Sequence, residues 1–150
     1  MSVNDQANSI ARDSTASREW FKTLIAETVA VDAAGVHAAL LSVRIHESVA
    51  SERTMKQLRT LLGRILSPTD RVEQTAPDSM SVLLAPQKDL RQTVSEVREI
   101  ADALHRAGLR SSTGFAQRRV SESLLDTWAR AEAQLDRASY RVESSNGITI

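Results

Sequence analysis

Apolar residues recur along much of this chain at the spacing of three or four positions that is typical of amphipathic helices. Residues 17–32 form the first such stretch, and Pro68 and Gly108 mark the ends of the second and third. Each stripe predicts a helix with one buried face. The apolar positions are Trp20, Phe21, Leu24, Ile25 and Val29; Met55, Leu58, Leu62, Ile65 and Leu66; Leu90, Val94, Val97, Ile100, Ala101 and Leu104; and Leu124, Leu125, Trp128, Ala131, Leu135 and Ala138.

Other stretches are short and apolar, or alternate between apolar and polar residues, as β-strands do. In residues 37–46 one expected face carries Leu41, Val43 and Ile45, and the other carries Leu40, Ser42, Arg44 and His46. Further strands are expected at residues 71–75, at residues 80–84 ahead of Pro86, at residues 109–116, and at residues 148–150 after a turn over Ser144–Gly147.

These elements follow the order α-β-α-β-β-α-β-α-β. Without the first helix, and without the last helix and the last strand, this is the ferredoxin-like βαββαβ unit. It predicts an α+β fold with a central, mostly antiparallel sheet flanked by helices. The strand at residues 38–46 should have a neighbour on each side. The strands at residues 71–75 and 80–84 should form a hairpin that joins the same sheet. Residues 1–12 are polar and lack periodicity, so a flexible N-terminal arm or a helix extension is expected there.

Composition narrows the possible functions. A chain of 150 residues is one domain's worth, and its 19 basic and 19 acidic residues cancel, which argues against nucleic acid as a partner. The absence of cysteine excludes disulfides and thiolate chemistry. No apolar run approaches the ~20 residues of a membrane span. The polar start of the chain does not resemble a signal peptide, so we expect a cytoplasmic protein without membrane insertion.

Several short segments of these elements have counterparts in one family of domains. They are Asp13–Phe21 (compare DxLTGLxNRxxF), Val43–His46 (Asp-x-Asp), Ser67 with Asp70 (RxxD), Ala76–Met80 (GGDEF), Ser112–Ala116 (SIGVA) and Ala131–Ser139 (ADxALYxAK). In this order and at these spacings they resemble a GGDEF domain, the diguanylate cyclase fold, over residues 13–150. The signature itself is reduced to Ala76, Pro77, Asp78, Ser79 and Met80.

The resemblance implies a magnesium site that this chain does not reproduce. Cyclisation of GTP needs Mg²⁺ on oxygen ligands, which the family supplies from Asp-x-Asp and from the third position of GGDEF. Asp78 keeps that third position, but Arg44 and His46 stand on the strand. A guanidinium repels a cation, so we expect no metal and no cofactor, with Asp78 either paired with Arg44 or capping the backbone of its turn. His46 is open to anion binding or to solvent.

The resemblance also implies nucleotide contacts that are absent or replaced. Glycines let the backbone approach a nucleotide, and Ala76 and Pro77 replace both of them. Only Glu47–Ala50 stands where the family has a longer segment that reads guanine. The lysine that faces phosphate falls at Ser139. The arginine of the inhibitory site falls at Ser67, which leaves Asp70 as its vestige.

We therefore expect no catalytic residues. The favoured function is that of a non-catalytic, degenerate GGDEF-like domain, an interaction or regulatory partner in a bacterial cyclic di-GMP-linked process. Its partner would be another protein or a second copy of itself. One alternative is a receptor that binds GTP or cyclic di-GMP without turnover, and another is an active cyclase. Trp20 and Trp128 are open to core packing or to a partner-binding patch.

Overall fold

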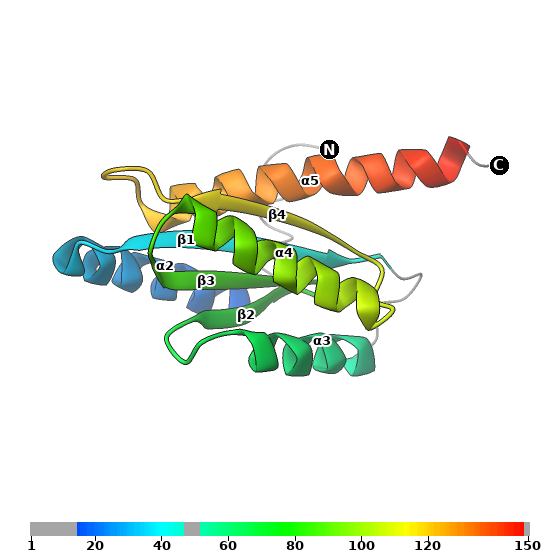
Figure 1. Ribbon diagram of the computed structural model, residues 1–150, viewed down its shortest axis with the longest axis horizontal. Coiled ribbons are helices and arrows are strands. Elements are labelled where there is room, and N and C mark those ends of the chain that lie inside the picture. Colours follow the sequence, from blue (N-terminus) through cyan, green and yellow to red (C-terminus); the bar gives the residue numbers. More distant parts are fainter. Residues whose placement is uncertain (1–14, 47–51, 149–150) are drawn as a thin grey trace.

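The computed structural model describes residues 15–46 and 52–148 (Figure 1). Their helices and strands alternate in the expected order up to the last helix. The elements are α2 (Thr15–Ala34), β1 (His37–Ile45), α3 (Glu52–Ile65), β2 (Arg71–Ala76), β3 (Ser79–Gln87), α4 (Leu90–Arg106), β4 (Ser111–Gln117) and α5 (Leu124–Ile148).

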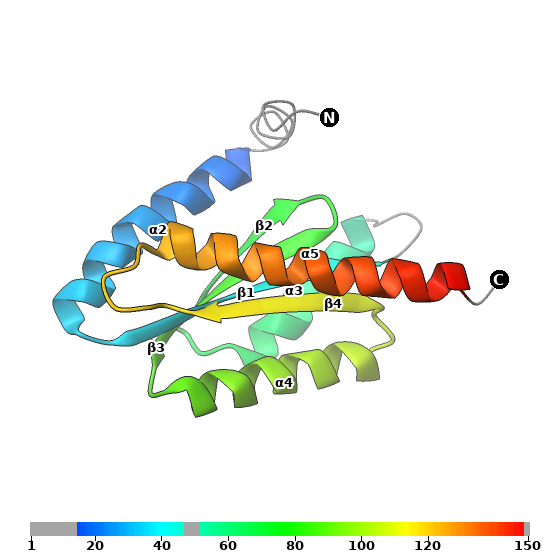
Figure 2. The same cartoon turned by 90° about the horizontal axis from the view of Figure 1, so that it is seen from above.

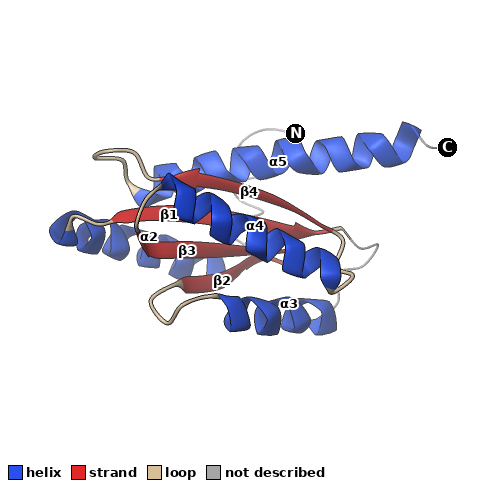
Figure 3. Cartoon of the chain, in the orientation of Figure 1, coloured by secondary structure: helices blue, strands red, loops and turns tan. Residues whose placement is uncertain are grey.

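The four strands form one antiparallel sheet in the order β2-β3-β1-β4. The strand at residues 37–45 thus lies between β3 and β4, and the hairpin β2–β3 belongs to the same sheet, which confirms both expectations. Helices cover both faces (Figure 3). α3 and α4 pack on one face of the sheet, while α2 and α5 pack on the other.

The alternation in β1 places its side chains in two separate cores. Leu41, Val43 and Ile45 pack with apolar residues of α3 and α4, as the pattern predicted. Leu40 packs with α2 and α5 on the opposite face, where Trp20 is also buried. Helices cover both faces of β1, so even the polar Ser42 is only 1% exposed, and Arg44, nearer the end of the strand, lies only partly buried. The second core also answers the question about Trp20, which is 1% exposed and belongs to the core.

Gly114 of β4 brings α5 against the sheet. A Cβ at this position would overlap the Leu135 backbone nitrogen and the Ala131 carbonyl oxygen of α5. Only a residue without a side chain allows this approach. The contact fixes α5, and with it the polar side chains that α5 directs toward the end of β1.

Two predicted chain boundaries are wrong. Ser144–Gly147 forms no turn, because α5 continues through it to Ile148, so the edge strand expected at residues 148–150 does not begin there. Residues 149–150 lie outside the described residues. Pro86 does not end the hairpin, because β3 continues to Gln87 with an irregularity in its register opposite His37 and Ala39.

The prediction that the apolar stripe of the first helix faces the core is only partly correct. Trp20 and Leu24 are buried, but Ile25 and Val29 are 57% and 68% exposed. α2 therefore has a second apolar stripe on its outer side. None of the helices in the described part of the chain is long and apolar enough to cross a membrane. The N-terminal arm expected at residues 1–12 lies outside that part.

Candidate functional site

The turn of the hairpin carries the residues that resemble the GGDEF signature. β2 ends at Ala76 and β3 begins at Ser79, so Pro77 and Asp78 form the turn itself. The Asp78 carboxylate accepts a hydrogen bond from the Ser79 hydroxyl at 2.9 Å. The backbone carbonyl of Asp78 accepts from the amide of Ile45 at 2.9 Å, which joins the turn to the end of β1. The expected backbone cap is thus replaced by a bond to the neighbouring hydroxyl.

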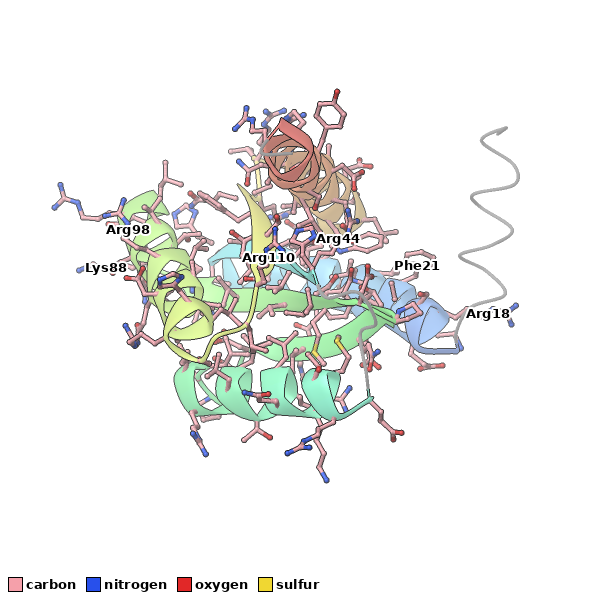
Figure 4. All side chains as sticks on the ribbon, turned by 90° about the vertical axis from the view of Figure 1, so that its right-hand side faces the viewer. Arg18, Phe21, Arg44, Lys88, Arg98 and Arg110 are labelled. Carbon is pink, nitrogen blue, oxygen red and sulfur yellow. The ribbon has the colours of Figure 1, made fainter. Side chains whose placement is uncertain are left out.

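Arg44 fills the space between the end of β1 and α5. It is opposite Ser79 in β3 and Ser112 in β4. Its Nη1 donates to the Ser139 hydroxyl at 3.2 Å, and its Nη2 lies 3.0 Å from the Asp136 carboxylate. Figure 4 shows Arg44 between the sheet and α5. The predicted salt bridge of Arg44 with Asp78 is therefore wrong, because the guanidinium extends to α5.

Glu132, on the same side of α5, completes an unbalanced group of charges. Burial raises the pKa of Glu132 to about 7, and the nearby carboxylates of Asp136 and Asp78 raise it further, against the opposing effect of Arg44. Three carboxylates thus share the surroundings of one guanidinium. No three histidine or carboxylate side chains among residues 15–46 and 52–148 are grouped so that they could hold a metal ion.

Sequence reasoning missed Glu132 and Asp136, although their spacing held a signal. Glu132, Asp136 and Ser139 are separated by four and then three positions, which places them on one face of a helix. The comparison with ADxALYxAK drew attention to Ser139 alone. The partner on β1 is remote in sequence, so only the fold brings the arginine to this face.

His46 is held by the neighbouring strand. Its Nε2 lies 2.6 Å from the Ser112 hydroxyl, and its amide donates to the Arg110 carbonyl at 2.7 Å. The half-buried ring therefore lies against β4, and the anion-binding interpretation has no support from these contacts. The short segment Glu47–Ala50 that follows lies outside the described residues.

Ser67 and Asp70, the two positions compared with the RxxD motif, help to support the hairpin. The Asp70 carboxylate accepts a hydrogen bond from the Ser67 amide at 2.9 Å and another from the Ala85 amide at 3.2 Å. It therefore ties the loop before β2 to the far end of β3. Asp70 and Ser67 lie together, and both carboxylate oxygens of Asp70 are engaged within the chain.

A groove of about 670 Å³ runs beside the signature turn, between α3 and β2. Lys56 and Arg59 of α3 contribute its cationic side chains, and Pro77 contributes part of its wall. The complete lining is Glu52, Met55, Lys56, Arg59, Thr60, Gln74 and Pro77. The groove thus combines two cationic side chains with the carboxylate of Glu52.

Comparisons with known proteins identify the fold. No family model matches the chain, and no curated protein matches it significantly. Solved structures do match. One is a microbial GGDEF domain studied with cyclic di-GMP, with 16% identity, a TM-score of 0.73 and coverage of 83% of this chain and 85% of that one. The chain has the GGDEF-domain fold.

Two further GGDEF-fold structures support this assignment. The GGDEF domain of YfiN from Pseudomonas aeruginosa is 14% identical with a TM-score of 0.73, covering 87% of this chain and 90% of that one. The active GGEEF domain of a diguanylate cyclase from Vibrio cholerae is 10% identical with a TM-score of 0.71, covering 83% and 90%. At these identities the likeness concerns the fold.

On this GGDEF fold the residues singled out from sequence separate into two places. Arg44 and Asp78 both lie near the end of β1, where the turn and α5 approach each other, although their side chains have different partners. Asp70 and Ser67 lie at the other end of the hairpin, since Asp70 contacts Ala85 near the end of β3. The first place carries the unbalanced charges, whereas the second is closed by hydrogen bonds to backbone.

Proposed function

We propose that this chain is a non-catalytic GGDEF-like domain that acts through protein contacts in a bacterial cyclic di-GMP-linked process. The observation that carries the proposal is the position of Arg44. Its guanidinium occupies the end of β1, where the resemblance places carboxylates, and is anchored to Asp136 and Ser139. A fixed positive charge there opposes the binding of Mg²⁺.

The signature turn supports the same proposal. Pro77 has no amide proton to donate and fixes its backbone, and Ala76 carries a side chain where the family has glycine. The one carboxylate kept in the signature, Asp78, accepts a hydrogen bond from Ser79. A turn built in this way keeps the hairpin in the sheet while losing close contact with a nucleotide.

The test for catalysis is incubation of the full chain with GTP and Mg²⁺, followed by chromatography for cyclic di-GMP. We expect no product. The double variant Arg44→Asp and His46→Asp should remain inactive too, because the residues between β1 and α3 are too few for the family's guanine-reading segment. An active diguanylate cyclase assayed in parallel is the positive control. Product from the unmodified chain would refute the proposal.

The test for a protein partner is capture from the native cell with the full chain as bait. A partner that binds the unmodified chain and fails to bind a variant altered on one surface would locate the interface. Partner binding that needs added cyclic di-GMP would instead favour a nucleotide receptor.

The groove beside Pro77 favours that second candidate, a receptor that binds GTP or cyclic di-GMP without turnover. Lys56 and Arg59 place two cations on its wall, and phosphate groups bind cations. Calorimetry with each nucleotide tests this directly. Binding that is lost in Lys56→Glu with Arg59→Glu would support the receptor, and the absence of binding to the unmodified chain would exclude it.

A further inference from the structure

The outer side of α2 carries an apolar stripe that no described element covers. Ile25 and Val29 are 57% and 68% exposed, and the neighbouring Ala26, Ala30 and Ala33 are exposed as well. Figure 2 shows the sheet and α5 on one side of α2 only. The opposite side of the same helix buries Trp20 and Leu24, so α2 is apolar on two sides. A solvent-facing stripe of this kind marks an interaction surface.

The charged residues on this outer side are distributed unequally along the helix. Because successive residues turn by about 100°, Lys22, Ile25, Val29 and Asp32 lie within one narrow outer sector. Lys22 precedes the two apolar residues and Asp32 follows them, so the stripe has a positive end and a negative end. Each charge already has a partner in its own chain: Lys22 lies 3.5 Å from Glu19, and Asp32 accepts from the largely buried Arg118 at 2.5 Å.

This pattern is complementary to itself when reversed. An antiparallel copy of α2 that crosses at the level of Glu27 places Ile25 against Val29 of that copy and Lys22 against its Asp32, because each pair is equally distant from that level. The two helix dipoles also oppose each other in this arrangement. The exposed alanines beside the stripe allow a close approach of the two helices.

We propose that this surface binds a second copy of the same chain, with the two α2 helices antiparallel about a two-fold axis. The interface is isologous, so each contact occurs twice. The inference rests on the proposed function, because it supplies one of the protein contacts through which a non-catalytic domain would act. A symmetric pair joined at α2 leaves the hairpin turn and the groove beside α3 uncovered for other partners.

The experiment measures the mass of the full chain by sedimentation over a concentration series. We expect the unmodified chain to form dimers. Lys22→Glu alone and Asp32→Lys alone should each weaken the dimer by about tenfold or more, since like charges then face each other twice. An equimolar mixture of these two variants should dimerise again, because every pair in the mixed dimer is attractive.

The mixture separates this interface from effects within one chain. Asp32→Lys also disturbs the pair with Arg118, but that disturbance is the same in the isolated variant and in the mixture. Ile25→Glu should give monomers at all concentrations. Leu90→Glu, which alters an exposed apolar residue of α4 on the other layer, should leave the dimer intact.

Several outcomes would overturn the inference: a monomeric unmodified chain, a dimer that tolerates Ile25→Glu, or single charge variants whose mixture stays monomeric. None of these touches the proposed function, whose own tests are incubation with GTP and capture of a protein partner. Conversely, product from GTP would refute the proposed function even if the dimer formed as described.

Discussion

Glu122 lies in the loop between β4 and α5, whereas Glu132 lies on α5 near Arg44 of β1, and the fold treats these two carboxylates differently. Glu122 accepts from Arg130 through both of its oxygens, at 2.9 and 2.6 Å, and from the hydroxyl of Thr127 at 2.8 Å. The bond from Arg130 is the main reason why the pKa of Glu122 falls to about 2. Burial instead raises the pKa of Glu132 to about 7.

The difference separates a region whose charges are paired from a region whose charges are not balanced. At the Glu122 end, Arg130 also donates to the Gln117 carbonyl and Arg118 to the Glu122 carbonyl, so the loop before α5 is closed by charged hydrogen bonds. At the other end one arginine stands among three carboxylates. That unbalanced group contains Arg44 and Asp78, the positions compared with the Asp-x-Asp and GGDEF motifs. Residues with a shifted pKa, such as Glu132, tend to gather at functional sites.

The largest effect should come from a substitution that pushes α5 away from the sheet, because α5 carries both Arg130, the partner of Glu122, and Glu132. In Gly114→Ala, the new methyl group overlaps backbone atoms of Leu135 and Ala131, and backbone cannot rotate away as a side chain can. We expect a loss of about 3 kcal/mol or more in the free energy of unfolding, measured with urea.

Gly63→Ala is the matched control for that variant. Gly63 lies in α3, where an added methyl group would meet open space, so alanine should stabilise the chain by about 0.5–1 kcal/mol through helix propensity. If Gly114→Ala were tolerated equally well, the close contact between β4 and α5 would be wrong.

The next largest effect should come from the closed end. Arg130→Met leaves the Glu122 side chain, which is 13% exposed, without its cation. Since Arg130 itself is 31% exposed, solvent screens part of the interaction, and we expect a loss of about 1–3 kcal/mol at pH 7. Urea unfolding measures this loss.

The pH dependence of that loss has a definite sign. A lowered pKa in the folded state contributes stability above pH 4.5 that disappears as the pH falls toward 2. The gap between Arg130→Met and the unmodified chain should therefore narrow in acid. A gap that is constant down to pH 2 would show that Arg130 acts by packing alone.

Glu132→Gln should have the opposite effect. The pKa of Glu132 is higher in the folded state, so the folded chain binds the proton of this carboxyl group more tightly than the unfolded chain does. The stability of the fold is therefore lost as the pH rises from 4.5 through 7. The neutral variant should be more stable than the unmodified chain by about 2–3 kcal/mol at pH 8 and nearly equal to it at pH 4.5.

Thermal or urea unfolding at the two pH values measures the difference. Glu99→Gln, an exposed carboxylate of α4, is the control and should change stability by no more than ~0.5 kcal/mol. Equal stability of Glu132→Gln and the unmodified chain at pH 8 would mean that solvent reaches this carboxylate freely.

Local pattern was enough to predict the sheet but not the charged group. Alternation in residues 37–45 and in the hairpin indicated strands with buried faces, and βαββαβ order then specified their neighbours. The motifs point to Arg44 and Asp78 as a pair, whereas Asp136 is supplied by a helix that only tertiary packing brings near Arg44. Burial of Glu132 likewise depends on the approach of α5 at Gly114.

Two features of the helices also escaped the pattern. Periodicity groups Ile25 and Val29 with the core stripe of α2, because it shows that a helix is amphipathic without showing that it has two apolar sides. The residues Ser144–Gly147 have turn propensity, yet they continue α5, since a long helix already formed extends at little cost through a few unfavourable residues.

The smallest effect is expected at the signature turn. Asp78→Ala removes the acceptor of the Ser79 hydroxyl and should cost ~0.5–2 kcal/mol, while the buried Leu83 of the same hairpin should cost about 2–5 kcal/mol when changed to alanine. Millimolar Mg²⁺, with or without GTP, should leave the melting temperature of the unmodified chain unchanged, because the Arg44 guanidinium at the end of β1 repels a cation. A turn that still held magnesium would behave differently, since a ligand that binds only the folded state raises the melting temperature. A rise with Mg²⁺ that disappears in Asp78→Ala would therefore return the turn to the functional residues and favour a nucleotide receptor or an enzyme over a scaffold.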